Sequence, residues 1–386
     1  MNVSRNIPVL FSIKFCKWLM LYMPIVLLFY KENNLGNNEL FLLHGIYSLV
    51  IALWEVPSGV IADRWGRKPS MQLGTFMGML GFLIYSFTGG FWGFLLAEIA
   101  LGLGQGFISG ADSALLYDTL YQKGENSKYI KVEGKITALG NLSEALAGVL
   151  VSVLAFSTYR NYYYLQSGIA FIGFFASFLL VEPSHFKILA AESNFIKTFM
   201  TSLKENKKLQ SIILISSLFG LSSLSMAWYA QIIFVETGVK HSWFGYGWTI
   251  LNLTVAVGSF FADSINKKFK PSTLIFILLV IFSSTFLISG LYLNMAVLSL
   301  ILVFYFARGI VHPIMKYFIN ELCSSDIRAT VLSVRSLQIR IVFAAVAPVL
   351  GVLSEKFSVQ YALLLSGTIV IIPGIVFYFR LIKNQR

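Results

Sequence analysis

The sequence predicts an all-α membrane protein in which twelve transmembrane helices form two pseudo-symmetric six-helix bundles. Three observations lead to this fold class: a low content of charge, twelve long apolar runs, and a short motif that recurs in equivalent turns of the two halves. Of the 386 residues, 56% are hydrophobic and 12% are charged, whereas about a quarter of the residues of a soluble domain are charged. This composition excludes a soluble enzyme, a disordered chain and a disulfide-stapled secreted module.

Twelve runs are long and apolar enough to cross a bilayer, which takes about 20 residues for each helix. Because lipid offers no partner to backbone polar groups, each run is predicted to be a helix. The first run is interrupted by Lys14 and Lys17 and is followed by no small-residue cleavage site, so it is not expected to be a signal peptide. The predicted spans are 9–30, 41–62, 70–88, 93–116, 136–157, 162–181, 209–233, 244–264, 273–292, 295–318, 332–354 and 359–380.

The position of the basic residues along the chain explains the formal net charge of +12. Twenty of the 30 lysines and arginines lie in the termini and in the turns that follow the even-numbered spans, and only four lie in the other turns. The positive-inside rule therefore predicts that both termini are cytoplasmic in a bacterial inner membrane. The basic excess is explained without a nucleic-acid partner.

The longest polar stretch divides the chain into two predicted bundles, residues 1–181 and 209–386, joined by a cytoplasmic linker at 182–208. Phe195, Phe199 and Leu203 recur at helical spacing among lysines of this linker. That pattern fits either a short interfacial helix on the membrane surface or a merely solvated connection.

The two halves share a motif in the same turn, between a second and a third helix. Ala62-Asp63 followed by Arg67-Lys68 recurs 200 residues later as Ala262-Asp263 followed by Lys267-Lys268. Paired six-helix halves are a transporter layout, in which the substrate is handled between the halves near the middle of the membrane.

Residues 59–68 read G-V-I-A-D-R-W-G-R-K, and this pattern resembles the signature turn of the major facilitator superfamily. The resemblance extends over the whole chain through the number of spans, the central loop and the half-repeat. The stretches 55–59, 109–118 and 328–333 are similar to a branch of bacterial facilitators that export drugs or metabolites. The resemblance implies the twelve-helix facilitator fold and transport by alternating access.

In this family the turn acts as a latch that holds the N-terminal half against helix 11 in one state, and the resemblance implies a charge network of Asp63, Arg67 and Asp118. The residues themselves agree: Gly66 permits the positive φ of a tight reversal, and Gly59 is expected to let the second helix approach a neighbour closely. Topology alone explains the basic residues, which can also reach the phosphates of membrane lipids. The predicted latch residues are Gly59, Asp63, Arg64, Gly66, Arg67, Lys68 and Asp118.

The second copy of the motif predicts a weaker latch. Asn266 replaces the second glycine, and after glycine asparagine is expected to be the residue that best tolerates a positive φ. Ser259 and Ser264 replace the first glycine and the first arginine.

Four acidic residues at membrane depth are candidates for proton coupling, because intramembrane charges are costly and usually face a water-filled path. Glu144 is predicted near the middle of helix 5, Glu98 in the outer third of helix 4, Asp112 near the inner end of helix 4, and Glu55 on the same face of helix 2 as Asp63. A carboxyl group without a cation can carry a proton, whereas one beside Lys or Arg forms a structural ion pair. Both interpretations stay open.

The intramembrane cations and several polar aromatic residues are candidates for lining the substrate cavity. Arg308, His312 and Lys316 repeat every four residues and form one stripe on helix 10. Arg308 and Arg340 would suit a substrate carboxylate or phosphate, or would pair with the acids, and His312 either carries a proton or bonds a carbonyl at the Pro313 bend. The candidates are Lys14, Lys17, Arg308, His312, Arg335, Arg340, Trp228, Gln231 and Asn252.

Two departures from the family pattern bear on antiport. Many facilitators have an arginine in helix 4, whereas the corresponding stretch of this chain, residues 97–104, contains Glu98. Helix 5 of this chain lacks the Gly-Pro-rich pattern of many antiporters. A small-residue and proline bend occurs instead at 344–351, in the symmetry-related helix.

The sequence thus predicts a secondary active transporter that moves a small amphipathic molecule by proton-coupled efflux. The alternative is proton-coupled uptake or exchange of a small organic anion. There is no Gly-x-x-x-x-Gly-Lys-Ser/Thr run for ATP hydrolysis. A membrane enzyme that acts on lipid would need clustered histidines or paired aspartates, and the four histidines are dispersed. No catalytic residue, metal or cofactor is expected, and the protein is expected to be a monomer with protons, lipids and a small molecule as partners.

Overall fold

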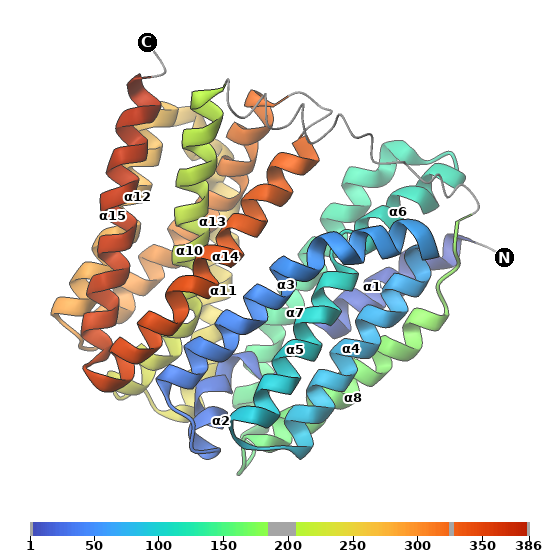
Figure 1. The fold of residues 1–386 in the computed structure, drawn as a ribbon, viewed down its shortest axis with the longest axis horizontal. Helices are drawn as coiled ribbons and strands as arrows, with labels where there is room; N and C mark the ends of the chain where they lie inside the picture. Colours follow the sequence, from blue (N-terminus) through green and yellow to red (C-terminus); the bar gives the residue numbers. More distant parts are fainter. Residues whose placement is uncertain (1–2, 184–205, 324–327, 384–386) are drawn as a thin grey trace. The chain divides into compact units, whose positions relative to one another are not determined.

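The computed structural model describes residues 3–183, 206–323 and 328–383. Over these ranges the chain is helical and contains no strand (Figure 1). Eleven helical stretches of the described chain are long and apolar enough to cross a bilayer. The remaining predicted span, 162–181, corresponds to α8 (Arg160–Phe178), whose first half is less apolar because it carries three tyrosines and a glutamine. The all-α membrane fold is confirmed, whereas the predicted interfacial helix in the linker falls outside the described residues.

Two predicted spans of the N-terminal half are interrupted. The first span breaks between Trp18 and Val26, around Pro24, and the fourth breaks at Ser109 and Gly110, where Gly110 has a φ of 81°. The sequence stays apolar through both breaks, so hydropathy alone does not reveal them. The helices are α1 (Asn6–Trp18), α2 (Val26–Glu32), α3 (Asn37–Trp65), α4 (Arg67–Phe87), α5 (Gly90–Ile108), α6 (Ala111–Gln122), α7 (Tyr129–Leu154) and α8 (Arg160–Phe178).

The C-terminal half consists of longer, unbroken helices. Each of the last three helices contains a proline, at positions 313, 348 and 373, and none of these prolines ends its helix. The helices are α10 (Lys207–Glu236), α11 (Phe244–Lys268), α12 (Pro271–Leu291), α13 (Val297–Leu322), α14 (Arg328–Lys356) and α15 (Val359–Lys383).

Contacts divide the described chain into two compact units. The N-terminal unit comprises residues 3–39, 46–183 and 242–249, and the C-terminal unit comprises 40–45, 206–241, 250–323 and 328–383. The division follows the predicted halves except for the two short segments 40–45 and 242–249. Small residues account for both exceptions, because Gly45 lies against Ala347 and Gly245 lies against Gly148.

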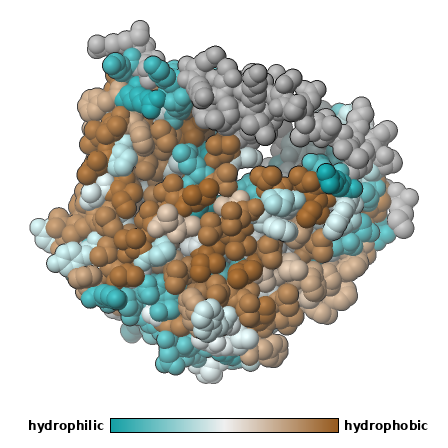
Figure 2. All heavy atoms as spheres, in the orientation of Figure 1, coloured by the Kyte–Doolittle hydropathy of each residue, from teal (hydrophilic) through white to brown (hydrophobic). Residues whose placement is uncertain are grey.

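Within each unit, small residues let helix backbones approach closely. In the N-terminal unit α4 packs on α5, and a methyl group added to Gly74 would lie 2.9 Å from the carbonyl oxygen of Gly104. In the C-terminal unit α12 packs on α15, and a methyl group added to Gly290 would lie 2.9 Å from the carbonyl oxygen of Gln360. Apolar side chains cover much of the visible helix surface (Figure 2), as a lipid environment requires.

Candidate functional site

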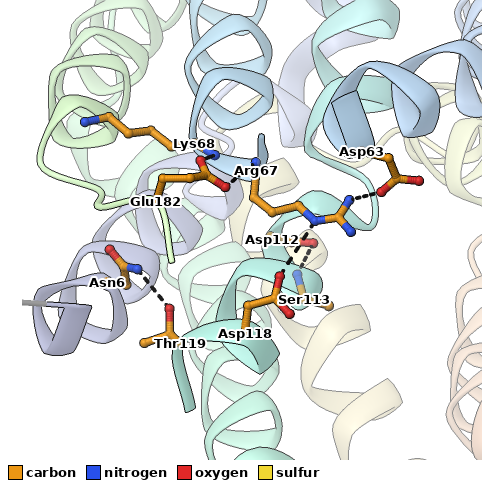
Figure 3. Close-up of polar contacts among 9 residues, drawn as sticks. All are labelled: Asn6, Asp63, Arg67, Lys68, Asp112, Ser113, Asp118, Thr119 and Glu182. Carbon is orange, nitrogen blue, oxygen red and sulfur yellow. Dashed lines mark hydrogen bonds and ion pairs between the residues drawn. The ribbon is translucent and has the colours of Figure 1, made fainter. Parts of the chain in front are cut away.

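The turn between α3 and α4 depends on one glycine and one acidic residue from elsewhere in the chain. Gly66 has a φ of 108° and separates the two helices. The two carboxylate oxygens of Glu182 accept hydrogen bonds from the backbone N–H groups of Arg67, at 2.8 Å, and Lys68, at 2.7 Å (Figure 3). A carboxylate at a helix N-terminus is stabilised by the unpaired N–H groups and the helix dipole. Glu182 therefore holds the start of α4.

The three charged residues of the implied network lie together in the structure. Arg67 Nη1 lies 2.6 Å from Asp63 Oδ1, and Arg67 Nε lies 3.9 Å from Asp118 Oδ2 (Figure 3). The three side chains come from α3, α4 and α6, so the network joins three helices of the N-terminal unit. Arg67 is the shared member and carries the only positive side-chain charge of the three.

Asn6 of α1 joins the same end of the unit to the segment that follows α8. Its side-chain amide donates to Thr119 Oγ1 and to the carbonyl oxygen of Val181, both at 2.8 Å, and its Oδ1 accepts from the Val181 N–H at 2.7 Å. Asn6 is fully buried. Together with Glu182, it fixes the point at which the chain leaves the N-terminal unit for the linker.

Two predictions for the turn need correction. A methyl group added to Gly59 would meet nothing within 4 Å among the described residues, so close packing is not the reason for this glycine. Asn266 lies inside α11 and has no positive φ, because that helix continues to Lys268. The repeated feature is instead an ion pair four residues apart: Lys267 Nζ lies 2.6 Å from Asp263 Oδ2.

Glu98 of α5 lies in a buried cluster of tyrosine hydroxyl groups. Only 3% of its surface is exposed. Its Oε1 accepts hydrogen bonds from the hydroxyl of Tyr85, at 2.5 Å, and from that of Tyr30, at 3.4 Å. The two hydroxyl oxygens are 2.7 Å apart. Because a hydroxyl both donates and accepts, this network can hold the carboxyl group with or without its proton.

The other acidic candidates lie in different settings. Glu144 is half-buried on α7, and Tyr22 lies within electrostatic range of both Glu144 and Glu98. Glu55 is half-buried on α3. Asp112 lies in the first turn of α6, and its Oδ2 is 3.9 Å from Lys14 Nζ. Asp112 therefore fits the ion-pair interpretation.

A small pocket lies beside Lys14 within the N-terminal unit. Its charged lining consists of Lys14, Lys17, Asp112 and Glu133, and its apolar lining comes from α1, α4, α5 and α7. Glu133 was not among the predicted residues, and its Oε1 accepts a hydrogen bond from Ser113 Oγ at 3.0 Å. The pocket combines charges of both signs with apolar side chains, and its volume of about 10 Å³ is that of a space for a single water molecule.

Arg160, at the start of α8, holds the opposite end of α4. Its Nη1 donates to the carbonyl oxygens of Tyr85, Ser86 and Thr88 at 3.2, 3.0 and 2.5 Å. Its Nη2 donates to Asn33 Oδ1 at 2.6 Å. In the sequence, Arg160 is distinguished only as one of the four basic residues in the turns that follow odd-numbered spans.

In the C-terminal unit, the predicted cations occupy α13 and α14. The guanidinium of Arg308 lies over the ring of Tyr305, 5.3 Å from its centroid. Arg335 Nε donates a short hydrogen bond to Ser216 Oγ of α10. Arg335, Lys316 and Arg308 all act electrostatically on the imidazole of His312. Three of the predicted cavity residues thus lie at four-residue spacing on α13, with Arg335 of α14 within electrostatic range of His312, and Arg340 lies further along α14.

The uncharged cavity candidates are more buried than their predicted role requires. Trp228 and Gln231 of α10 are 8% and 1% exposed. The indole of Trp228 stacks on the imidazole of His44, with ring centroids 3.6 Å apart and an interplanar angle of 7°. Asn252 of α11 is half-buried. Trp228 and Gln231 thus contribute to the packing of the C-terminal unit in this conformation.

Sequence reasoning missed Glu182, Asn6, Tyr30 and Tyr85 because each acts through a partner that is remote in sequence. The bonds from Asn6 span 113 and 175 residues, and the Tyr30 to Tyr85 contact spans 55. One signal was available: Glu182 is an acidic residue directly after an apolar span, at the edge of a basic cytoplasmic region.

Comparison with known proteins assigns the family. The model of the Major Facilitator Superfamily matches residues 10–337, which is most of the chain. The chain belongs to the major facilitator superfamily. The twelve-helix expectation agrees with this family.

Individual relatives are distant. The chain is 27% identical to the inner membrane transport protein YajR of Escherichia coli over 43% of this chain and 36% of that protein. It is 25% identical to the multidrug resistance protein MdtG of Salmonella paratyphi B over 54% of this chain and 52% of that protein. The chain matches between about a third and a half of the length of such curated relatives.

Solved structures share the fold over the full chain. A crystal structure of the nucleoside transporter NupG has a TM-score of 0.81 with 13% identity and covers 100% of both chains. At this identity the similarity establishes the facilitator fold alone. The family and the structural neighbours are transporters rather than enzymes, and this chain is a multi-pass membrane protein of that family.

Proposed function

We propose that this facilitator exports a small amphipathic molecule across the bacterial inner membrane in exchange for protons, with both termini in the cytoplasm. The multidrug resistance name of one relative supports export of an amphipathic molecule. The inner-membrane name of another supports the location, and the distribution of basic residues supports the orientation.

The buried Glu98 cluster is the observation that carries proton coupling. A carboxyl group that is 3% exposed and bonded to two hydroxyl groups is a site where a proton can be held and released within the membrane. Protonation reverses the direction of a hydrogen bond in this cluster rather than removing the bond. Glu144 is half-buried on α7 and, like Glu98, lies within electrostatic range of Tyr22, which supports it as the second proton-carrying residue of the proposal.

The turn at Gly66 is the conformational latch of this proposal. Arg67 joins Asp63 and Asp118, and Glu182 holds the start of α4 beside them. Because Glu182 lies at the beginning of the linker, a change in the turn would act on the connection between the predicted halves. Lys14 and Lys17, with the pocket that they line, form part of the substrate path.

A second candidate function is proton-coupled uptake or exchange of a small organic anion. Its support is that no carboxylate in the described part of the C-terminal unit lies within ion-pairing distance of Arg308 or Arg340. Both functions use the same carrier and differ in substrate charge and direction.

The first prediction concerns Glu98→Gln in purified full-length protein that is reconstituted into liposomes containing the pH dye pyranine. Phenyl phosphate and ethidium serve as an anionic and a cationic amphipathic probe, added outside. We expect the probe-driven proton flux of the wild-type protein to be lost in this variant, because an amide cannot carry the proton.

The matched control is Glu32→Gln, which changes an exposed acidic residue of the same unit. It should retain the wild-type flux. A Glu98→Gln protein that moves protons at the wild-type rate would remove this residue from the mechanism. Glu144→Gln, measured in the same way, separates the two candidate carriers.

A further inference from the structure

The C-terminal unit has an unbalanced charge at membrane depth. Arg308 lies 11 residues from the start of α13, which is roughly 16 Å along the helix at 1.5 Å per residue. Arg335 lies 7 residues into α14, and Lys316 lies 6 residues before the end of α13. The acidic residues in the described part of this unit all lie within five residues of a helix end: Glu236, Asp263, Glu321 and Glu355. Arg308, the deepest of these cations, therefore has no carboxylate of the described part of its own unit at the same depth.

Two of these cations are held in place by groups that do not neutralise them. Arg335 donates from Nε to the hydroxyl of Ser216, which is itself fully buried. Arg308 lies over the ring face of Tyr305, which is 1% exposed. A hydroxyl and a ring face orient a guanidinium but leave its net charge in place. The single bond from Arg335 to Ser216 uses one of its five N–H donors.

His312 lies on the same stripe of α13 as two of the cations. It lies one helical turn from Arg308 and one from Lys316, and Arg335 of α14 lies within electrostatic range of its imidazole. Three groups that can donate N–H hydrogen bonds therefore share one face of α13.

Charges of one sign at membrane depth are costly unless water or an opposite charge reaches them. Arginine forks match the geometry of carboxylate and phosphate oxygens, and such bonds are stronger than bonds between neutral groups. We propose that Arg308, His312 and Lys316 of α13, together with Arg335 of α14, form a binding site for the carboxylate or phosphate group of a small organic substrate. This site refines the proposed transport function by naming the charge of the substrate, and it applies to either direction of transport.

The test is oxyanion binding by the purified full-length protein in a neutral detergent, without a pH gradient. The melting temperature is titrated with benzoate and with phenyl phosphate, against chloride at equal ionic strength. We expect saturable stabilisation by at least one oxyanion and none by chloride. Arg308→Gln and Arg335→Gln should each weaken the apparent affinity at least about tenfold, which corresponds to about 1.4 kcal/mol of binding free energy.

The matched control is Arg380→Gln, which removes an exposed arginine of the same unit that bonds Gln210 at 2.7 Å. It should bind the oxyanion as the wild-type protein does. Arg308→Lys keeps the charge but loses the fork, and an intermediate affinity is expected. Affinities are compared rather than melting temperatures, so a variant that is merely less stable still gives a result, and the two arginines provide independent tests.

Three outcomes would overturn the site: no stabilisation of the wild-type protein by either oxyanion, unchanged affinity in both arginine variants, or stabilisation by added phosphatidylglycerol alone. The last outcome would mean that a lipid headgroup, rather than a substrate, occupies the cluster. Oxyanion binding is measured without a pH gradient, whereas the proton flux of Glu98→Gln is measured in liposomes, so failure of proton coupling and failure of this site are separate results.

Discussion

Gly66 shows how one residue can serve two purposes in the signature turn. Its φ of 108° lies in a region that residues with a side chain rarely adopt. A methyl group at this position would also lie 2.8 Å from Glu182 Oε2, in the place that the carboxylate needs to reach the N–H groups of α4. Gly59, seven residues earlier, is under neither constraint in this conformation. The two glycines of one motif are therefore not equivalent.

The second prediction follows from this difference. Gly66→Ala is expected to destabilise the purified protein by about 1–3 kcal/mol, the usual cost of a strained backbone conformation. The measurement is thermal unfolding in detergent. Gly59→Ala is the control and should melt within a degree or two of the wild-type protein. Equal melting temperatures for the two variants would contradict the role assigned to Gly66.

At the scale of elements, α4 is held at both ends by side chains that flank the sixth predicted span, 162–181: Arg160 precedes this span and Glu182 follows it. Glu182 holds its N-terminus, and Arg160 donates to three carbonyl oxygens at its C-terminus. The signs match the helix dipole, which favours an anion at the first end and a cation at the second. Carbonyl groups at the end of a helix have no partner within the helix. These contacts supply the missing partners.

The third prediction tests the C-terminal contact. Arg160→Gln should lower stability by about 1–3 kcal/mol, because several buried carbonyl groups lose a charged donor. Arg64→Gln, which changes an exposed arginine of the signature turn, should have little effect on thermal unfolding. If both variants unfold alike, Arg160 is not needed to hold α4.

The fourth prediction concerns the charge network of α3, α4 and α6. Asp63→Asn should slow proton flux in the pyranine assay by roughly fivefold, which corresponds to about 1 kcal/mol in the barrier, while insertion and thermal stability stay normal. Asp263→Asn is the matched control, because Asp263 makes the equivalent ion pair with Lys267 in the second copy of the motif. An unchanged rate in Asp63→Asn would end the latch interpretation.

At the scale of the whole molecule, the acidic residues at membrane depth are confined to one unit of the described chain. The N-terminal unit carries Glu55, Glu98 and Glu144 together with Lys14 and Lys17, whereas the described part of the C-terminal unit carries only cations at this depth, on α13 and α14. This asymmetry favours separate tasks, with proton transfer in the first unit and recognition of a substrate anion in the second. A proton and an anion at different sites can be coupled through the conformational change that facilitators undergo.

The fifth prediction concerns orientation in the membrane. In a background with Cys16→Ala and Cys323→Ala, single cysteines replace Lys128 and Lys240, which are both exposed. A membrane-impermeant maleimide should label position 240 in intact cells and position 128 only after permeabilisation, because the positive-inside rule places the two turns on opposite sides. The reverse labelling pattern would invert the proposed topology.

Much of the fold could be predicted from the sequence, whereas the site was predicted unevenly. Asp63, Arg67 and Asp118 were expected together from the family pattern, and they lie together. The breaks near Pro24 and at Gly110 were missed, because hydropathy averages over them. Asn266 was wrongly expected in a left-handed turn, since the longer α11 moves the turn past it.

The sequence by itself determined the membrane environment, the helical class, the approximate spans and the family. These follow from hydropathy, charge and short motifs, which are properties of continuous segments. Only the tertiary structure decided that Glu98 bonds tyrosines, that Glu182 and Arg160 hold the two ends of α4, and that Arg335 bonds Ser216. Those partners depend on which helix faces pack together. No local pattern encodes contacts between residues that are tens to more than a hundred positions apart.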